Sequence, residues 1–216
     1  RMIEEKSDVR KKVAVGATSY HGPPSTSFGS QSPLWQKNYQ VIYPVPTAYG
    51  TFDEAELMAK YEAFLDNYGD EIGVMLIEPQ WGSSQAALPW PEHLLKNYVK
   101  LAKERGIKII CDEIMCGLGR HGKGTLFVSE AWDLDPDAVT FGKAIATGVF
   151  QLSGAILKRG RDTLKANKCT VMQSHTYAGS STRALMAATA VLKELVTWLP
   201  NINHLGNEMA NIMNYL

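Results

Sequence analysis

An acid and a lysine follow two apolar stretches in the middle of this 216-residue sequence. Residues 107–111 read IKIIC and precede Asp112, and residues 138–141 read AVTF and lead to Lys143. Short apolar runs rich in β-branched residues are typical of buried strands in a parallel sheet. Ligands of open α/β sheets bind outside the carboxyl ends of such strands. The spacing therefore predicts that Asp112 and Lys143 face one cavity.

A carboxylate and an amine in this arrangement suit a cofactor with an electron-poor pyridine ring and an aldehyde. A lysine binds the aldehyde of pyridoxal 5′-phosphate (PLP), and a carboxylate keeps the ring nitrogen protonated. The same residues also have ordinary explanations, because an Asp-Glu pair can cap a helix and a Gly-Lys pair can form a solvated turn. Cys111 and Cys116 flank the acids without further His or Cys at ligand spacing. We therefore predict packing cysteines and no metal site.

The joint pattern DEIxxGxGRxG followed by TFGKAxxxG (residues 112–122 and 140–148) resembles that of the class III PLP-dependent aminotransferases, the ω-aminotransferase family. The resemblance implies that Asp112 pairs with the pyridine nitrogen and that Lys143 is the catalytic lysine that carries the cofactor. Ile114, in the same motif, is expected among the cofactor-binding residues. The implied fold class is α/β: a mostly parallel sheet flanked by helices, the large domain of a fold-type I PLP enzyme.

The Tyr-His-Gly triplet at residues 20–22 and the Glu-Pro pair at 78–79 match two further motifs of the family. By that resemblance the ring of Tyr20 stacks on the cofactor, which suits a flat π surface. Glu78 then supports the cofactor site through hydrogen bonds. From the residues alone, Tyr20 could be an ordinary aromatic at a strand end, and Glu78 a solvent-facing strand terminus. His21 has two open roles, a hydrogen bond within its loop or support behind the cofactor.

Residues 172–179 match the family segment that precedes a long helix, and the resemblance gives Thr176 a contact with the cofactor phosphate of the partner subunit. The alternative is that Thr176 only turns or caps the chain. A phosphate bound across an interface implies a homodimer. The aromatic segment 34–49 is a candidate contact surface for that dimer, or it folds over its own domain.

Composition limits the partners. The chain has 22 basic and 22 acidic residues, and this balance argues against a nucleic-acid or anionic-membrane surface. No apolar run approaches the roughly 20 residues that span a bilayer. Three cysteines without framework spacing fit a reducing compartment, so we expect a cytoplasmic protein. The chain begins with Arg1, so a targeting segment cannot be judged.

Helices and strands are expected to alternate, which predicts right-handed parallel crossovers. Beyond the two strands above, we expect strands at residues 12–17, 72–77 and 155–158, and at most one edge strand within 33–50. Helices are expected at residues 53–68, ending at Gly69, and at 91–105, ending at Gly106. Further helices are expected at residues 160–168, 181–198 and 201–216.

Residues 1–200 are expected to form a partial cofactor-binding large domain, and residues 201–216 to begin a helix leading to a C-terminal small domain. The family's upstream Gly-Ser loop for the cofactor phosphate has no counterpart here, so we expect a fragment with an incomplete site. Met115 stands where the family often has a glutamine that contacts the cofactor's phenolic oxygen; apolar residues there resemble the amine-to-pyruvate branch.

The resemblance implies an aminotransferase that moves an amino group between an amine or amino acid and a keto acid, such as pyruvate, or an aldehyde. Its partners would be these small molecules. Two alternatives remain. The same family contains aminomutases, racemases and decarboxylases, and the chain by itself could be an inactive α/β fragment or an interaction module.

Overall fold

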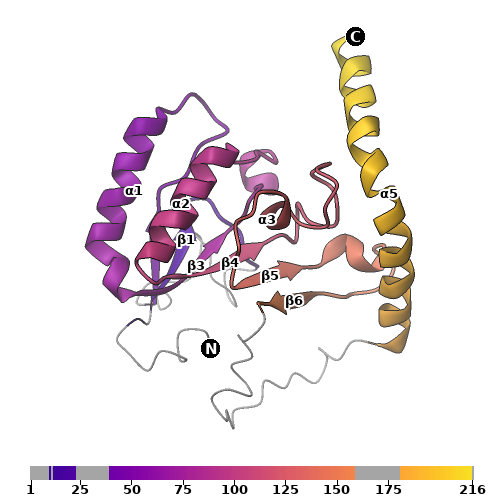
Figure 1. The fold of residues 1–216 in the computed structure, drawn as a ribbon, viewed down its shortest axis with the longest axis horizontal. Helices are drawn as coiled ribbons and strands as arrows, with labels where there is room; N and C mark the ends of the chain where they lie inside the picture. Colours follow the sequence, from indigo (N-terminus) through magenta and orange to yellow (C-terminus); the bar gives the residue numbers. More distant parts are fainter. Residues whose placement is uncertain (1–9, 11, 23–38, 159–180, 216) are drawn as a thin grey trace. The chain divides into compact units, whose positions relative to one another are not determined.

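The computed structural model describes residues 10, 12–22, 39–158 and 181–215. They contain a six-stranded sheet with the strand order β2-β1-β3-β4-β5-β6 (Figure 1). The strands are β1 (Lys12–Gly16), β2 (Gln40–Tyr43), β3 (Ile72–Ile77), β4 (Lys108–Asp112), β5 (Ala138–Phe141) and β6 (Gly154–Leu157). The chain divides into two compact units. The first holds the described residues up to Asp112 with Pro136–Val139 and 156–158, and the second holds Glu113–Asp135, Thr140–Ala155 and 181–215.

The sheet is mostly parallel, as predicted. Strand β1 pairs in parallel with both β2 and β3, and β3 pairs in parallel with β4. Strand β6 runs antiparallel to its neighbour β5. The amide of Lys158, just after β6, donates to the carbonyl of Asp137, just before β5, at 2.9 Å, so the end of one strand lies beside the start of the other. The expected edge strand within residues 33–50 is β2, which lies at one end of the strand order.

Helices α1 (Glu54–Tyr68) and α2 (Glu92–Glu104) lie side by side in the first unit, on one face of its strands (Figure 1). Both crossovers, β2 to β3 and β3 to β4, advance in the same direction across the sheet, so right-handed connections place both helices on the same face. Tyr61 of α1 stacks on Tyr98 of α2 with ring centroids 3.7 Å apart, and both are fully buried. This aromatic contact fixes the two helices together over the strands that carry the candidate site.

The two glycines predicted to end these helices behave differently. Gly106 follows α2 with φ +73°, the left-handed conformation expected of a terminating glycine. Gly69 has φ −56° and is right-handed, so it continues into the 3₁₀ turn Gly69–Glu71 instead of stopping the chain. The prediction that Gly69 ends this helix is confirmed, since α1 ends at Tyr68 and Gly69 is its C-cap, although Gly69 is right-handed.

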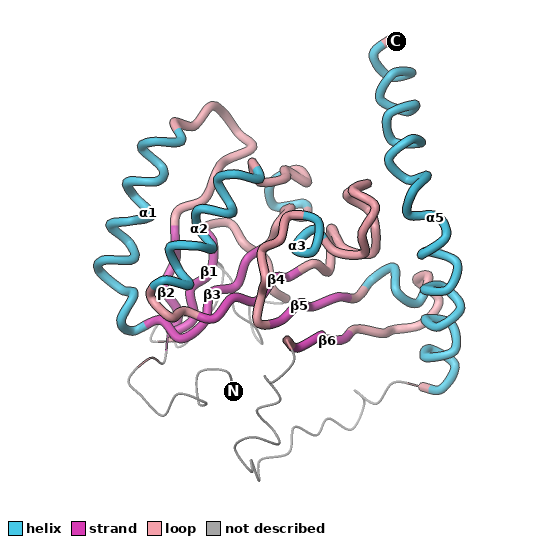
Figure 2. Tube along the Cα trace, in the orientation of Figure 1, coloured by secondary structure: helices cyan, strands magenta, loops and turns pink. Residues whose placement is uncertain are grey.

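The second unit packs helix α5 (Thr182–Asn214) against the 3₁₀ turn Lys143–Ala146. Its buried core consists of Leu118, Ile145, Ala146 and Ala188. A short helix, α3 (Val128–Ala131), follows the long loop after β4, which is seen as a continuous loop trace in Figure 2. Ser181 caps α5, its side chain accepting a hydrogen bond from the amide of Ala184 at 3.1 Å.

Two separate helices were predicted for residues 181–198 and 201–216. The structure corrects this, because α5 is one helix of 33 residues that contains Pro200. Proline removes one amide and disfavours the preceding turn, yet the hydrogen bonds on either side can still continue a helix. The predicted helix at 160–168 and Thr176 lie outside the described residues. Within the described residues, no helix is long and apolar enough to cross a membrane.

Candidate active site

A tight turn after β1 presents the Tyr-His-Gly motif. The amide of Ser19 donates to the carbonyl of Gly16 at 3.1 Å, and the amide of Ala17 donates to the carbonyl of Tyr43 at 2.9 Å. Thr18 takes a left-handed φ of +68°, which is costly for a β-branched residue. The turn therefore changes the direction of the chain just before Tyr20 and His21.

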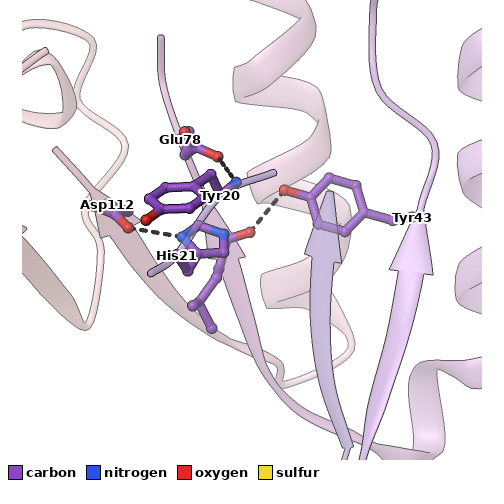
Figure 3. Close-up of polar contacts among 6 residues, drawn as sticks. Tyr20, His21, Tyr43, Glu78 and Asp112 are labelled. Carbon is purple, nitrogen blue, oxygen red and sulfur yellow. Dashed lines mark hydrogen bonds and ion pairs between the residues drawn. The ribbon is translucent and has the colours of Figure 1, made fainter. Parts of the chain in front are cut away.

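His21 contacts Asp112, the last residue of β4 (Figure 3). Its Nδ1 donates to the Asp112 Oδ2 at 2.7 Å, and the two side chains are only 4% and 12% exposed. Strand β4 was expected at residues 107–111; it lies one residue later, so Asp112 is held by the strand itself. The Nε2 of His21 is buried and has no hydrogen-bond partner among the described residues. His21 thus bonds to a side chain on another strand and not within its own loop, and its support of the cofactor stays a prediction.

Glu78 follows β3 and contacts the same turn. Its Oε1 accepts a hydrogen bond from the amide of Tyr20 at 2.8 Å (Figure 3). Glu78 is buried, so it is not the solvent-facing terminus that the sequence allowed. Burial raises the pKa of Glu78, while His21, the Tyr20 amide and the Ser19 hydroxyl act in the opposite direction. The Tyr20 ring, in contrast, is 61% exposed, so this turn offers an aromatic face to solvent.

Ser19 is a site residue that the sequence motifs did not reveal. The residue is only 4% exposed, and its side chain lowers the pKa of Glu78. The available signal was its position: it immediately precedes the Tyr-His-Gly triplet at a strand end.

The second acid of the pair, Glu113, has a different role. Its carboxylate accepts from the amides of Val128 at 2.6 Å and Ser129 at 2.8 Å, and from the Ser129 hydroxyl. Burial raises the pKa of Glu113, and these donors offset part of that effect. Glu113 therefore caps the first turn of α3 and organises the second unit. The capping explanation considered for the Asp-Glu pair thus holds for Glu113, while Asp112 pairs with His21.

Lys143 begins the 3₁₀ turn that follows β5. Its φ is +47°, a left-handed value that is unfavourable for a lysine, and its side chain is exposed. Strained backbone of this kind is concentrated at functional sites. The Ile114 Cγ1 lies 3.8 Å from where a Cβ on the preceding Gly142 would stand, so Ile114 borders the peptide that leads into Lys143. Within the second unit, the predicted site residue Ile114 thus lies beside Gly142, the residue before Lys143.

The glycines of the GxGR loop serve packing. Gly119 has φ +80°, and a Cβ there would lie 2.5 Å from the Leu199 Cδ2 of α5. A Cβ on Gly122 would be 3.4 Å from the Asn203 Cα of the same helix. Arg120, between them, is exposed. The absence of side chains at these glycines therefore lets α5 pack closely on the loop within the second unit.

The structure thus brings Tyr20, His21, Glu78 and Asp112 into one cluster of the first unit, and places Ile114 beside the peptide before Lys143 in the second. The predicted phosphate contact, Thr176, lies outside the described residues. The donor set fits PLP: a carboxylate oriented by a buried histidine, an exposed aromatic ring and an exposed amine on strained backbone.

The comparisons with known proteins agree with this chemistry. The family model "Aminotransferase class-III" matches residues 1–216, and the chain belongs to the class III aminotransferase family, whose members use PLP.

Three similar proteins illustrate the range of this family. The LysW-aminoadipate semialdehyde/glutamate semialdehyde transaminase of Sulfolobus acidocaldarius is 30% identical over 94% of this chain and 49% of its own. The alanine/serine racemase of Pyrococcus horikoshii is 32% identical over 66% of this chain and 32% of its own. A structure of taurine:2-oxoglutarate aminotransferase from Bifidobacterium kashiwanohense, in complex with PLP and glutamate, matches 99% of this chain and 50% of that one, with a TM-score of 0.72 and 24% identity. The chain thus spans a third to a half of the length of these relatives.

Proposed function

We propose that the full-length protein, meaning the complete natural polypeptide that contains these residues, is an aminotransferase. It would move an amino group between an amine or amino acid and a keto acid, such as pyruvate, or an aldehyde. The observation that carries this proposal is Lys143, an exposed amine on strained left-handed backbone directly after a strand. Membership of the class III family supports the reaction class.

The described residues can take distinct roles. Lys143 would hold PLP covalently and, once released, would take the proton from the substrate Cα and return it during product formation. Asp112, oriented by His21, would keep the cofactor's ring nitrogen protonated. The ring of Tyr20 and the side chain of Ile114 would supply flat and apolar contacts for the pyridine. When bound, PLP supplies an electron-poor ring that delocalises the electron pair left at Cα.

Replacement of Lys143 by alanine tests the assignment. The full-length Lys143→Ala variant is expected to lose the near-visible absorbance of lysine-bound PLP. Borohydride reduction followed by peptide mass spectrometry should find no cofactor fixed to the variant, whereas the unmodified protein carries it on Lys143. Lys123→Ala is the matched control, because Lys123 is an exposed lysine of the same unit. Cofactor covalently fixed in Lys143→Ala would show that another residue carries it.

The second candidate is a racemase, aminomutase or decarboxylase that uses the same cofactor. It is favoured by one observation, the 32% identity to a protein named alanine/serine racemase. Incubation of the full-length protein with amino donors and pyruvate separates the two: alanine formation supports the aminotransferase. Racemised, rearranged or decarboxylated product without alanine would favour the alternative.

A further inference from the structure

The side chain of Gln85 joins two loops at the carboxyl end of the sheet. One loop, residues 44–53, follows β2, and the other, residues 78–91, follows β3 and contains Gln85. The Nε2 of Gln85 donates to the carbonyl of Pro46 at 2.9 Å, and its Oε1 accepts from the amide of Ala48 at 3.1 Å. Gln85 is only 1% exposed. Because the side-chain amide is buried, both hydrogen bonds are needed to offset the cost of removing it from water.

The loop after β3 starts and ends beside the cofactor cluster. Pro79 follows Glu78, and the carbonyl of Pro79 accepts from the amide of Trp90 at 3.1 Å, so the loop closes one residue away from that acid. Glu78 in turn accepts from the amide of Tyr20 at 2.8 Å. Ligands of open α/β sheets bind outside the carboxyl ends of the strands, and both loops leave the sheet at that edge.

The loop after β3 has a strained backbone next to Gln85. Ala86 and Ala87 have left-handed φ values of +50° and +58°. Such values are unfavourable for a residue with a Cβ, and they persist where the surrounding structure enforces them. The Nε2 of Gln80 donates to the carbonyl of Ala87 at 2.8 Å and so supports the loop from within. Gln85 adds a tie from this loop to the loop after β2.

We propose that Gln85 is a positioning residue: its two bonds, the Gln85 latch, hold the loops after β2 and β3 together, so that the wall of the site beside Glu78 is formed before substrate binds. Gln85 acts through the backbone of Pro46 and Ala48 and touches no reacting atom. The latch belongs to the folded first unit, whereas its effect on substrate rests on the proposed function. A loosened wall would have to be ordered by the substrate, and this cost would weaken substrate binding.

Amide hydrogen exchange tests the latch in the full-length protein without cofactor. Gln85→Met keeps an unbranched side chain of similar length that forms neither bond. In this variant the amide of Ala48 is expected to exchange about tenfold faster, because it loses its acceptor. The amide of Met75, in the buried strand β3, reports global opening, so any loss of overall stability is measured there. The latch is refuted if Ala48 is accelerated no more than Met75.

Gln80→Met is the matched control, because it removes a glutamine hydrogen bond from the same loop without removing a bond to the loop after β2. It should leave the exchange of Ala48 unchanged, and equal acceleration in the two variants would refute the latch. Should Gln85→Met not fold, Gln85→Asn replaces it. Asparagine keeps a polar amide in the buried position, but with one methylene fewer it does not span both partners, so Ala48 should again exchange faster.

The kinetics of the full-length protein with PLP test the positioning role. In the assay that forms alanine from pyruvate, Gln85→Met should raise KM for pyruvate about fivefold and change kcat by less than about twofold, as expected when only substrate binding is weakened. An unchanged KM together with faster Ala48 exchange would overturn the positioning role. Because exchange is measured without cofactor or substrate, a failure of the proposed aminotransferase function would not affect that result, and the two proposals fail separately.

Discussion

Two residues of the site are held in energetically unfavourable states. Lys143 has a left-handed backbone, and Glu78 is an acid buried behind Tyr20. Neither state improves the packing of the fold by itself. Strained conformations and perturbed acids are concentrated at functional sites. Both can be measured as contributions to stability, independently of activity.

The strain at Lys143 predicts the order of two variants. A left-handed conformation costs a residue with a Cβ about 1–2 kcal/mol, whereas glycine adopts it freely. In urea unfolding, the free energy of unfolding of Lys143→Gly is therefore expected to be about 1 kcal/mol higher than that of Lys143→Ala. Lys100, an exposed lysine in α2, gives the control. There the order should reverse, because glycine is about 1 kcal/mol worse than alanine inside a helix. Equal stability of the two Lys143 variants would contradict the strained geometry.

Burial of Glu78 predicts a pH dependence of stability. Because burial raises the pKa of Glu78, the folded state binds this proton more tightly than the unfolded chain does. Its contribution to stability is therefore fully present below the unfolded pKa of about 4.3, and it is lost as the pH rises through the higher folded pKa.

Urea unfolding of the unmodified protein and of Glu78→Gln, at a series of pH values from about 4 upward, measures this effect. The free energy of unfolding of the unmodified protein minus that of the variant should fall as the pH rises, and then level off. Glu113→Gln should give a slope of the same sign, since burial raises that pKa too. A difference that grows with pH would contradict the burial of Glu78.

At the scale of elements, the contact between the glycine loop and α5 organises the second unit. Gly119→Ala would place a Cβ 2.5 Å from the Leu199 Cδ2 and would strain a φ of +80°. We expect a loss of about 2–4 kcal/mol in the free energy of unfolding, the sum of backbone strain and overpacking.

Gly124→Ala separates these two contributions. Gly124 has nearly the same φ, +79°, but a Cβ there meets nothing within 4 Å. Gly124→Ala should therefore lose about 1 kcal/mol of the free energy of unfolding, from backbone strain alone. Combination of Gly119→Ala with Leu199→Ala should recover part of the packing cost, as a double-mutant cycle would show. Equal losses for the two glycine variants would mean that α5 does not approach the loop at Gly119.

At the scale of the whole molecule, we propose a homodimer in which Thr176 of each subunit contacts the cofactor phosphate of the other. A ligand that binds only the assembled state stabilises it by mass action, so cofactor binding and association would be coupled. Thr176→Ala should weaken PLP retention by about 1.5–3 kcal/mol, the contribution of a hydrogen bond to a charged group. Spectral titration of the full-length variant measures this loss.

A mixed dimer decides which subunit supplies the threonine. When a Thr176→Ala subunit is paired with a Lys143→Ala subunit, one site keeps its lysine and faces an intact partner threonine. That site should bind PLP as tightly as the unmodified protein. If it instead binds as weakly as the Thr176→Ala homodimer, the threonine acts within its own subunit.

The sequence determined the strands and the acid and lysine at their ends. Strand periodicity is local, and the motifs place Asp112 and Lys143 at fixed distances from apolar runs. The five predicted strands were found within about a residue, and the edge strand was anticipated. Family membership followed from the joint motif, in which the acid, the glycine loop and the lysine occur at compatible spacing.

The tertiary structure decided which partners several polar residues of those motifs contact. His21 is hydrogen-bonded to Asp112, and Glu78 accepts a hydrogen bond from the amide of Tyr20. Glu113 caps α3 by accepting from the amide of Val128. The structure also joined two predicted helices through Pro200 and showed that Gly69 does not reverse the chain. Hydrogen-bond partners separated by 58 or 91 residues depend on how strands pack side by side. A linear sequence does not contain that proximity, because it arises only when burial brings distant strand ends together.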